Sequence, residues 1–185
     1  IGAWNYQTFL SLSPVVGALA AGNHVMVKPS EVTPRTAEVI ARMLAERFPP
    51  EYVTAVTGGP DVAAAVSALP FDHLIFTGST RVGQLVARAA SEALVPVTLE
   101  LGGKSPAIVH RRFDAAAAAD RIVAGKLLNA GQTCVAPDYA LVARGQAEPF
   151  VAAARAAAAS RYPRLVGNRD YTRLVTRRHW ERLDA

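Results

Sequence analysis

One thiol stands out among the residues that can do chemistry. Cys134 is the only cysteine in 185 residues, and it follows Gly131-Gln132-Thr133, a run that predicts a flexible loop beside a helix end. A substrate can reach a thiol in such a loop, and a thiolate is a strong nucleophile, so Cys134 is a candidate for covalent catalysis. The alternative is a small buried hydrophobic side chain, which is the commoner role of a single cysteine.

One carboxylate is the second candidate. Glu100 lies in an apolar segment, residues 95–101, directly before Gly102-Gly103. Ligands in open α/β sheets lie outside the carboxyl ends of the strands, and a half-buried carboxylate at such an end suits general-base work. The alternative is a glutamate on the solvent face of an edge strand.

Neither of two glycine-containing stretches matches a phosphate-binding motif. Residues 103–105 read Gly-Lys-Ser, but a P-loop needs a glycine five places earlier, where the chain has Thr98, so we reject this motif. Residues 78–83 lack the middle glycine of the dinucleotide fingerprint. What remains is a turn, Gly78-Ser79, between a strand and a helix, and a helix N-terminus is a fair anion site.

Other functional classes find little support. The four histidines are scattered along the chain at positions 24, 73, 110 and 179, so no metal site is predicted. The formal charge of +5 comes largely from arginines in residues 161–182, which we interpret as a solvated face. A nucleic-acid partner is not expected, because no basic run or binding motif accompanies these arginines. Apolar runs such as residues 15–21 are too short to span a bilayer.

Helix-like and strand-like segments alternate, which is the pattern of a parallel α/β sheet. Strands are expected at residues 24–28, 52–57, 73–76, 95–101, 106–109 and 139–142. Helices are expected after Asn5, after the cap Thr33, over residues 61–69 starting at Asp61, after Ser79, and over residues 114–128 and 147–160. The helix after Ser79 is expected to bury Val82, Leu85, Val86 and Ala89. A domain boundary is expected near Gly102-Gly103.

The chain resembles the aldehyde dehydrogenase superfamily over nearly its whole length. The match lies in segments that keep the family's order: Ala3-Trp4-Asn5-Tyr6, Lys28-Pro29-Ser30-Glu31, Phe76-Thr77-Gly78-Ser79, Leu99-Glu100-Leu101-Gly102-Gly103-Lys104 and Gly131-Gln132-Thr133-Cys134. Residues 2–6 and 131–139 are similar to class 3 and coniferyl aldehyde dehydrogenases, and residues 125–130 to the coniferyl group. Gln7 departs from the proline that is usual in the family.

The resemblance implies a fold and a mechanism. Residues 1–101 would form part of a Rossmann-like parallel sheet in the NAD(P)-binding domain, and residues 102–185 the start of an α/β catalytic domain. Cys134 would attack the aldehyde carbon, and the Asn5 amide and the Cys134 N–H would hold the oxyanion. Hydride transfer to the nicotinamide would leave a thioester, which water activated by Glu100 would hydrolyse to the acid.

The resemblance also implies the cofactor and the setting. The adenosine ribose of NAD or NADP would contact Lys28 and Glu31, and the pyrophosphate would lie at Gly78-Ser79. Glu31 suits a ribose diol and so favours NAD, while Lys28 tolerates a 2′-phosphate. The expected substrate is an aromatic or hydrophobic aldehyde such as coniferyl aldehyde, and the expected enzyme is a homodimer. It is expected in the cytoplasm, since a single thiol suits a reducing compartment.

The ends of the chain suggest an internal piece of a longer enzyme. It begins with Ile1 rather than methionine, and residues 179–183 read like a helix cut partway. We expect such a piece to be inactive by itself. The alternative function is a truncated, inactive remnant that serves only as a folded or binding module.

Overall fold

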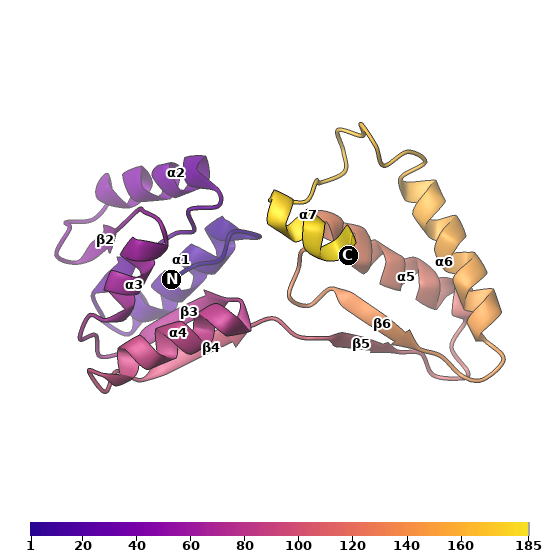
Figure 1. Ribbon diagram of the computed structural model, residues 1–185, viewed down its shortest axis with the longest axis horizontal. Helices are drawn as coiled ribbons and strands as arrows, with labels where there is room; N and C mark the ends of the chain where they lie inside the picture. The colour runs from indigo at the N-terminus through magenta and orange to yellow at the C-terminus, as the bar shows by residue number, and fades with distance from the viewer. Residues whose placement is uncertain (185) are drawn as a thin grey trace. The chain divides into compact units, whose positions relative to one another are not determined.

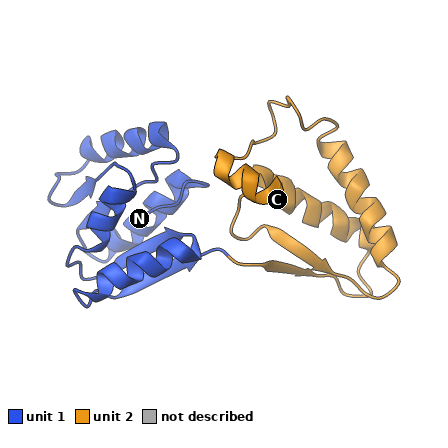
Figure 2. Ribbon diagram, viewed as in Figure 1, with its two compact units in different colours: residues 1–102 blue, residues 103–185 orange. Residues whose placement is uncertain are grey.

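The computed structural model describes residues 1–184 and divides the chain into two compact units, residues 1–102 and 103–185 (Figure 2). Unit 1 alternates helices and strands, as the sequence predicts (Figure 1). Its elements are α1 (Gln7–Ala20), β1 (Val25–Val27), α2 (Pro34–Ala45), β2 (Val53–Ala55), α3 (Pro60–Ser67), β3 (Leu74–Gly78), α4 (Thr80–Ser91) and β4 (Val97–Leu101).

The strands of unit 1 run parallel. β1 pairs with β2, and β3 pairs with β4. The first residues of the chain lie between these pairs: the Ile1 nitrogen donates to the Ile75 carbonyl at 2.7 Å, the Thr77 N–H to the Ile1 carbonyl at 3.0 Å, and the Gly2 N–H to the Lys28 carbonyl at 3.0 Å. This is the hydrogen-bond pattern of parallel neighbours. The expected Rossmann-like α/β fold is confirmed, and the carboxyl ends of these strands share one edge.

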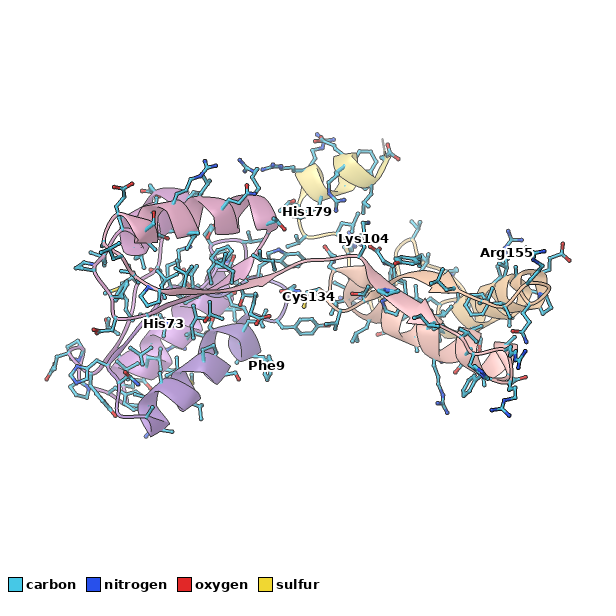
Figure 3. All side chains as sticks on the ribbon, turned by 90° about the horizontal axis from the view of Figure 1, so that it is seen from below. Phe9, His73, Lys104, Cys134, Arg155 and His179 are labelled. Atoms are coloured by element: carbon cyan, nitrogen blue, oxygen red, sulfur yellow. The ribbon has the colours of Figure 1, made fainter. Side chains whose placement is uncertain are left out.

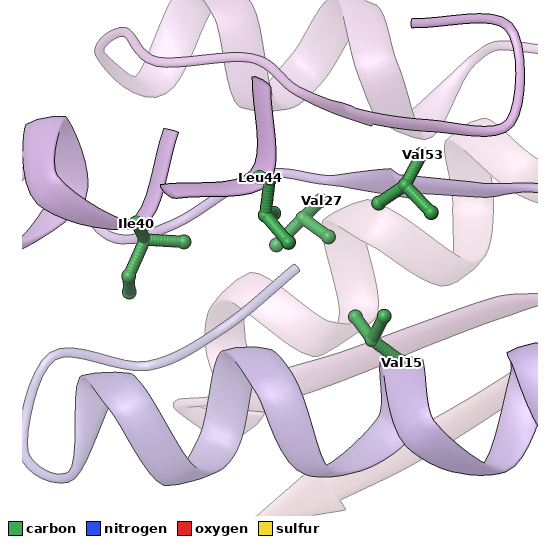
Figure 4. Packing of buried hydrophobic residues seen from close by; sticks show 5 residues of the cluster. All are labelled: Val15, Val27, Ile40, Leu44 and Val53. Atoms are coloured by element: carbon green, nitrogen blue, oxygen red, sulfur yellow. The ribbon is translucent and has the colours of Figure 1, made fainter. Parts of the chain in front are cut away.

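Apolar side chains from helices and strands fill the first core of unit 1. Figure 4 shows its buried members, Val15 of α1, Val27 of β1, Ile40 and Leu44 of α2, and Val53 of β2. Ile40 and Leu44 are four residues apart and so lie on one face of α2. This packing fixes α1 and α2 against the β1–β2 pair, from which the loop of residues 28–31 emerges.

The face that α4 buries differs from the predicted one. We expected Leu85 to point into the core, but its side chain is 52% exposed, while Gly83, Val86 and Ala90 are buried. Gly83 explains the difference, because a Cβ there would lie 2.8 Å from the Leu101 Cδ2. The missing side chain lets α4 approach β4 along the glycine face, which turns Leu85 outward.

Two helix starts also differ in detail. Thr33 is the N-cap of α2, as predicted, but its side chain makes no capping hydrogen bond. α3 begins at Pro60 with Gly59 as N-cap, one residue before the predicted start at Asp61. Proline suits the first helical position, where an N–H has no helical partner, and Asp61 then lies in the first turn, where its charge favours the helix dipole.

Unit 2 is built on a parallel strand pair and two long helices. Its elements are β5 (Ser105–Ile108), α5 (Ala115–Leu127), the 3₁₀ turn η1 (Leu128–Gly131), β6 (Pro137–Leu141), α6 (Ala147–Arg161) and α7 (Arg177–Asp184). β5 pairs with β6, and α5 packs against α6 (Figure 1). Small buried residues, Ala118, Ala119 and Ala157, let the two helices approach closely. An ion pair of 2.6 Å between Asp120 and Arg161 joins them.

Candidate active site

Most of the predicted site residues lie at one edge of unit 1. Asn5 follows the extended first residues, Lys28 follows β1, Ser79 follows β3, and Glu100 is the penultimate residue of β4. Because these segments run parallel, their ends meet at the same edge of the sheet. Glu100 is in register with Thr77, one residue before the end of β3. Topology alone therefore gathers residues that are far apart in the sequence.

Lys28 and Glu31 form an ion pair. The Lys28 side chain is only 2% exposed, and its Nζ lies 2.5 Å from the Glu31 Oε2, whereas the Glu31 side chain keeps 41% exposure. Burial raises the pKa of Glu31, but the hydrogen bond and charge of Lys28 outweigh this effect and leave the pKa below its usual value. The carboxylate is thus held in its charged form while part of it remains open to a hydroxyl donor.

The turn at Gly78-Ser79 opens α4. Ser79 is the N-cap, and its Oγ accepts a hydrogen bond of 3.3 Å from the Val82 N–H. The helix behind it has 12 residues, so its N-terminus carries the partial positive charge that anions bind. Packing also requires glycine at position 78, because a Cβ there would collide with the Phe76 ring.

Asn5 and Glu100 differ in their exposure to solvent. Asn5 is half-buried just before α1, whereas Glu100 is exposed, so the half-buried carboxylate that we expected is not observed. The sequence missed the role of Gln7. Its buried side chain donates from Nε2 to the Ser30 carbonyl at 3.0 Å and so ties the start of α1, next to Asn5, to the loop after β1.

Cys134 lies in unit 2, three residues after η1, and is labelled in Figure 3. Its thiol is exposed, so the alternative of a buried structural cysteine is wrong. The preceding turn has an uncommon backbone: Asn129, Ala130 and Gly131 all have positive φ, at 50°, 54° and 75°. The sequence predicted a loop, and the structure has a hydrogen-bonded turn, in which the Gln132 N–H donates to the Asn129 carbonyl at 3.0 Å.

A charged cluster follows the thiol on β6. The Asp138 carboxylate accepts from the Lys104 Nζ at 2.9 Å and from the Lys126 Nζ at 3.4 Å. The hydrogen bond from Lys104 is the main reason why the pKa of Asp138 lies below its usual value, and Lys126 adds to the effect. The cluster joins the start of β5, the end of α5 and β6, and no sequence motif indicated it.

The surface depressions of unit 2 contribute no residue to the candidate site. Two depressions in unit 2, of about 310 and 600 Å³, are lined by α6 and by residues 163–170, and neither contains a predicted site residue. Within residues 1–184, no three histidine, cysteine or acidic side chains gather as they would around a metal ion. Over the same residues, no helix combines the length and the apolar character that a membrane span needs.

A family model, curated relatives and solved structures match most of the chain. The model of the aldehyde dehydrogenase family matches residues 1–183. The chain is 54% identical over 97% of its length to a probable coniferyl aldehyde dehydrogenase of Pseudomonas aeruginosa, of which it covers 38%. It superimposes on a substrate-bound Staphylococcus aureus AldH with a TM-score of 0.90 and 44% identity, covering 97% of this chain and 40% of that one. For an NAD⁺-complexed Mycobacterium tuberculosis aldehyde dehydrogenase, the values are 0.78 and 40%, over 84% and 32%. The chain thus spans about two fifths of the length of the curated relatives that it matches.

Proposed function

Because the chain belongs to the aldehyde dehydrogenase family, we propose that it carries the nucleophile, the base and the oxyanion donor of an enzyme that oxidises an aromatic or hydrophobic aldehyde, such as coniferyl aldehyde, to the carboxylic acid. The observation that carries the proposal is the exposed thiol of Cys134, the only cysteine of the sequence, two residues after a hydrogen-bonded turn. The similarity to coniferyl aldehyde dehydrogenases supports the substrate class.

The chemistry assigns one task to each residue. The Cys134 Sγ attacks the aldehyde carbon, so that a C–S bond forms and the carbonyl oxygen becomes an oxyanion. The side-chain amide of Asn5 and the backbone N–H of Cys134 donate hydrogen bonds to that oxygen. A bound NAD or NADP would supply the acceptor for the hydride that leaves the former aldehyde carbon, and the loss of this hydride leaves a thioester on Cys134. Glu100 then takes a proton from the water that attacks the thioester, and the C–S bond breaks to release the acid and the thiol.

The cofactor would rest on the edge of unit 1. Glu31 offers a charged and partly open carboxylate to a ribose diol, while the N-terminus of α4 at Gly78-Ser79 suits a pyrophosphate. Lys28 is already engaged by Glu31, and a 2′-phosphate beside that carboxylate would meet repulsion. We therefore favour NAD over NADP. The NAD⁺ complex of the Mycobacterium tuberculosis relative is in keeping with this choice.

Three further parts of the proposal come from the resemblance. Residues 1–101 would belong to the cofactor-binding domain, and residues 102–185 to the domain that bears the cysteine. The enzyme would be a homodimer. It would work in the cytoplasm, where a reducing milieu keeps an exposed thiol such as Cys134 in its active form.

A graft tests the proposal directly. The matching region of the Pseudomonas aeruginosa relative is replaced by this sequence, and oxidation of coniferyl aldehyde is followed by the absorbance of NADH. We expect turnover in the graft, and Cys134→Ser should lower kcat on the order of a thousandfold or more, because no other thiol of this chain can replace the nucleophile. NAD binding should stay within about twofold, since Cys134 does not hold the cofactor.

Two outcomes would contradict the proposal. One is steady turnover in the Cys134→Ser graft. The other is a graft that folds, melts cooperatively and binds NAD but does not oxidise the aldehyde, because the catalytic groups assigned to this chain would then not be sufficient. Ser91→Ala is the control, because its exposed hydroxyl donates to the Arg88 carbonyl one turn back, at the end of α4 and away from the assigned residues.

A further inference from the structure

The side chain of Gln132 links the turn before the thiol to a distant segment of unit 2. Its Nε2 donates to the Asn129 carbonyl at 3.0 Å and to the Arg173 carbonyl at 3.1 Å. Its Oε1 accepts from the Val175 N–H at 3.0 Å. One amide thus bonds to the backbone at three points, and two of these lie more than 40 residues further along the chain.

We infer that Gln132 is a positioning residue for Cys134, acting by clamping the turn of residues 129–132 to residues 173–175. This inference rests on the proposed function, in which Cys134 is the nucleophile. Gln132 does not touch the reacting atoms. Its effect passes through two peptide units to Cys134, so the direction in which the thiol points depends on where the clamp holds the backbone.

The backbone before Gln132 shows why a clamp is needed. Asn129 and Ala130 have positive φ, a conformation that residues with a side chain rarely adopt, and Gly131 continues it. Such a turn persists only where the surroundings hold it. The hydrogen bonds of the Gln132 side chain stabilise the turn, and the Asn129 Nδ2 adds a hydrogen bond of 3.3 Å to the Gln132 carbonyl. Without the clamp, residues 129–131 would relax toward commoner backbone conformations.

The clamp is more specific than a general structural contact. Gln146 offers a comparison within the same unit: its Nε2 donates to the Arg111 carbonyl at 3.3 Å, but its Oε1 is buried without a hydrogen-bond partner. Only Gln132 of this pair uses both ends of its amide, and only Gln132 lies close to the thiol in sequence, two residues before it. Residues 173–175, which carry no motif, thereby become part of the frame that sets the position of Cys134.

The test uses the 185-residue chain and three variants. Gln132→Ala removes the clamp, Gln132→Glu keeps the size and the acceptor for Val175 but loses both donated bonds, and Gln146→Ala is the matched control. Hydrogen exchange at the Val175 amide reports on the clamp. The rate of Cys134 alkylation by iodoacetamide, followed by mass, reports on the thiol, since the chain has no other cysteine.

We expect Val175 exchange to become at least tenfold faster in Gln132→Ala, and the alkylation rate to change at least threefold in both Gln132 variants. Gln146→Ala should change neither. If Gln132→Ala unfolds unit 2, as circular dichroism would show, Gln132→Glu decides by the alkylation rate alone. The inference is overturned if the Val175 amide is unprotected in the unchanged chain, or if alkylation stays the same in the folded Gln132 variants.

The enzymatic consequence separates this inference from the proposed function. In the graft, Gln132→Glu should lower kcat at least tenfold and change the KM for the aldehyde less than threefold, because the residue does not bind substrate. If Cys134→Ser leaves turnover intact, the proposed function fails while the exchange and alkylation results still stand. If Cys134→Ser abolishes turnover and Gln132→Glu does not lower kcat, only the positioning role fails.

Discussion

The pair of Lys28 and Glu31 should make a measurable contribution to the stability of unit 1. In Glu31→Gln, the ammonium of Lys28, which is 2% exposed, would keep a polar neighbour but lose its counter-charge. Breaking a fully buried pair costs about 3–5 kcal/mol, and an exposed pair contributes at most about 1 kcal/mol. With Glu31 41% exposed, solvent screens part of the attraction. We therefore expect a loss of about 2 kcal/mol in the free energy of unfolding.

Urea unfolding followed by the fluorescence of Trp4 measures this loss. Trp180→Phe removes the only other tryptophan, which lies in unit 2, so the signal then comes from unit 1 alone. With a urea dependence of about 2 kcal/mol per molar, the midpoint should fall by about 1 M. Glu46→Gln is the control, because its pair with Arg42 is 4.0 Å long and both side chains are exposed. An equal midpoint shift in the two variants would refute the reasoning.

The same pair predicts a dependence on pH. The pKa of Glu31 is lowered in the folded chain, so its contribution is fully present above the unfolded value of 4.5 and is lost as the pH falls through the folded pKa. The difference in stability between the unchanged chain and Glu31→Gln should thus be constant from pH 7 to about pH 5.5 and shrink below pH 4.5. A difference that grows on acidification would contradict the ion pair.

Two more substitutions test the edge of unit 1. In the graft, Glu100→Gln should still give a burst of NADH close to one per active site, while steady turnover falls about a hundredfold or more, because the base acts only after the hydride has left; loss of the burst would refute that order. Gly78→Ala should destabilise unit 1 by about 1–3 kcal/mol, since its Cβ would collide with the Phe76 ring, whereas Gly102→Ala has open space and should change stability by less than about 0.5 kcal/mol. Equal effects at the two glycines, measured by urea unfolding, would contradict the packing.

The architecture of unit 1 could be predicted from the sequence because local signals agree with the fold. Apolar runs alternate with segments of helical periodicity. A polar residue or a glycine marks the end of three strands: Lys28 follows β1, Gly78 is the last residue of β3, and Gly102 follows β4. Parallel pairing then brings Lys28, Ser79 and Glu100 to one edge of the sheet. This placement could be predicted without knowing where their side chains point. The buried faces of the helices could not be predicted as well. Gly83 decides which side of α4 packs against β4, and a glycine contributes no apolar side chain to the pattern from which a buried face is predicted.

Partners that are distant in sequence could not be predicted. The burial of Lys28 contradicts the usual exposure of lysine and depends on Glu31, although the spacing of three residues was visible in the sequence. Asp138 forms ion pairs with Lys104 and Lys126, which lie in two other segments of the chain. Gln132 bonds to a segment more than 40 residues away. Such contacts follow from tertiary packing, about which local patterns carry no information.

The two parts of the candidate site therefore depend on different interactions, and substitutions should affect them differently. The edge of unit 1 is set by backbone pairing and by a packed apolar core, so a change at Ile40 or Val53 weakens the whole unit before it displaces Glu100. The turn before Cys134 is held by side-chain hydrogen bonds, above all those of Gln132, because the left-handed residues 129–131 lie outside the regular hydrogen-bond ladder of a strand or an α-helix. A change at Gln132 can thus move the thiol while the α5–α6 pair, which is the most extensive helix or strand contact in unit 2, stays intact. For this reason, thiol reactivity and global stability should separate in variants of the turn and fall together in variants of the core.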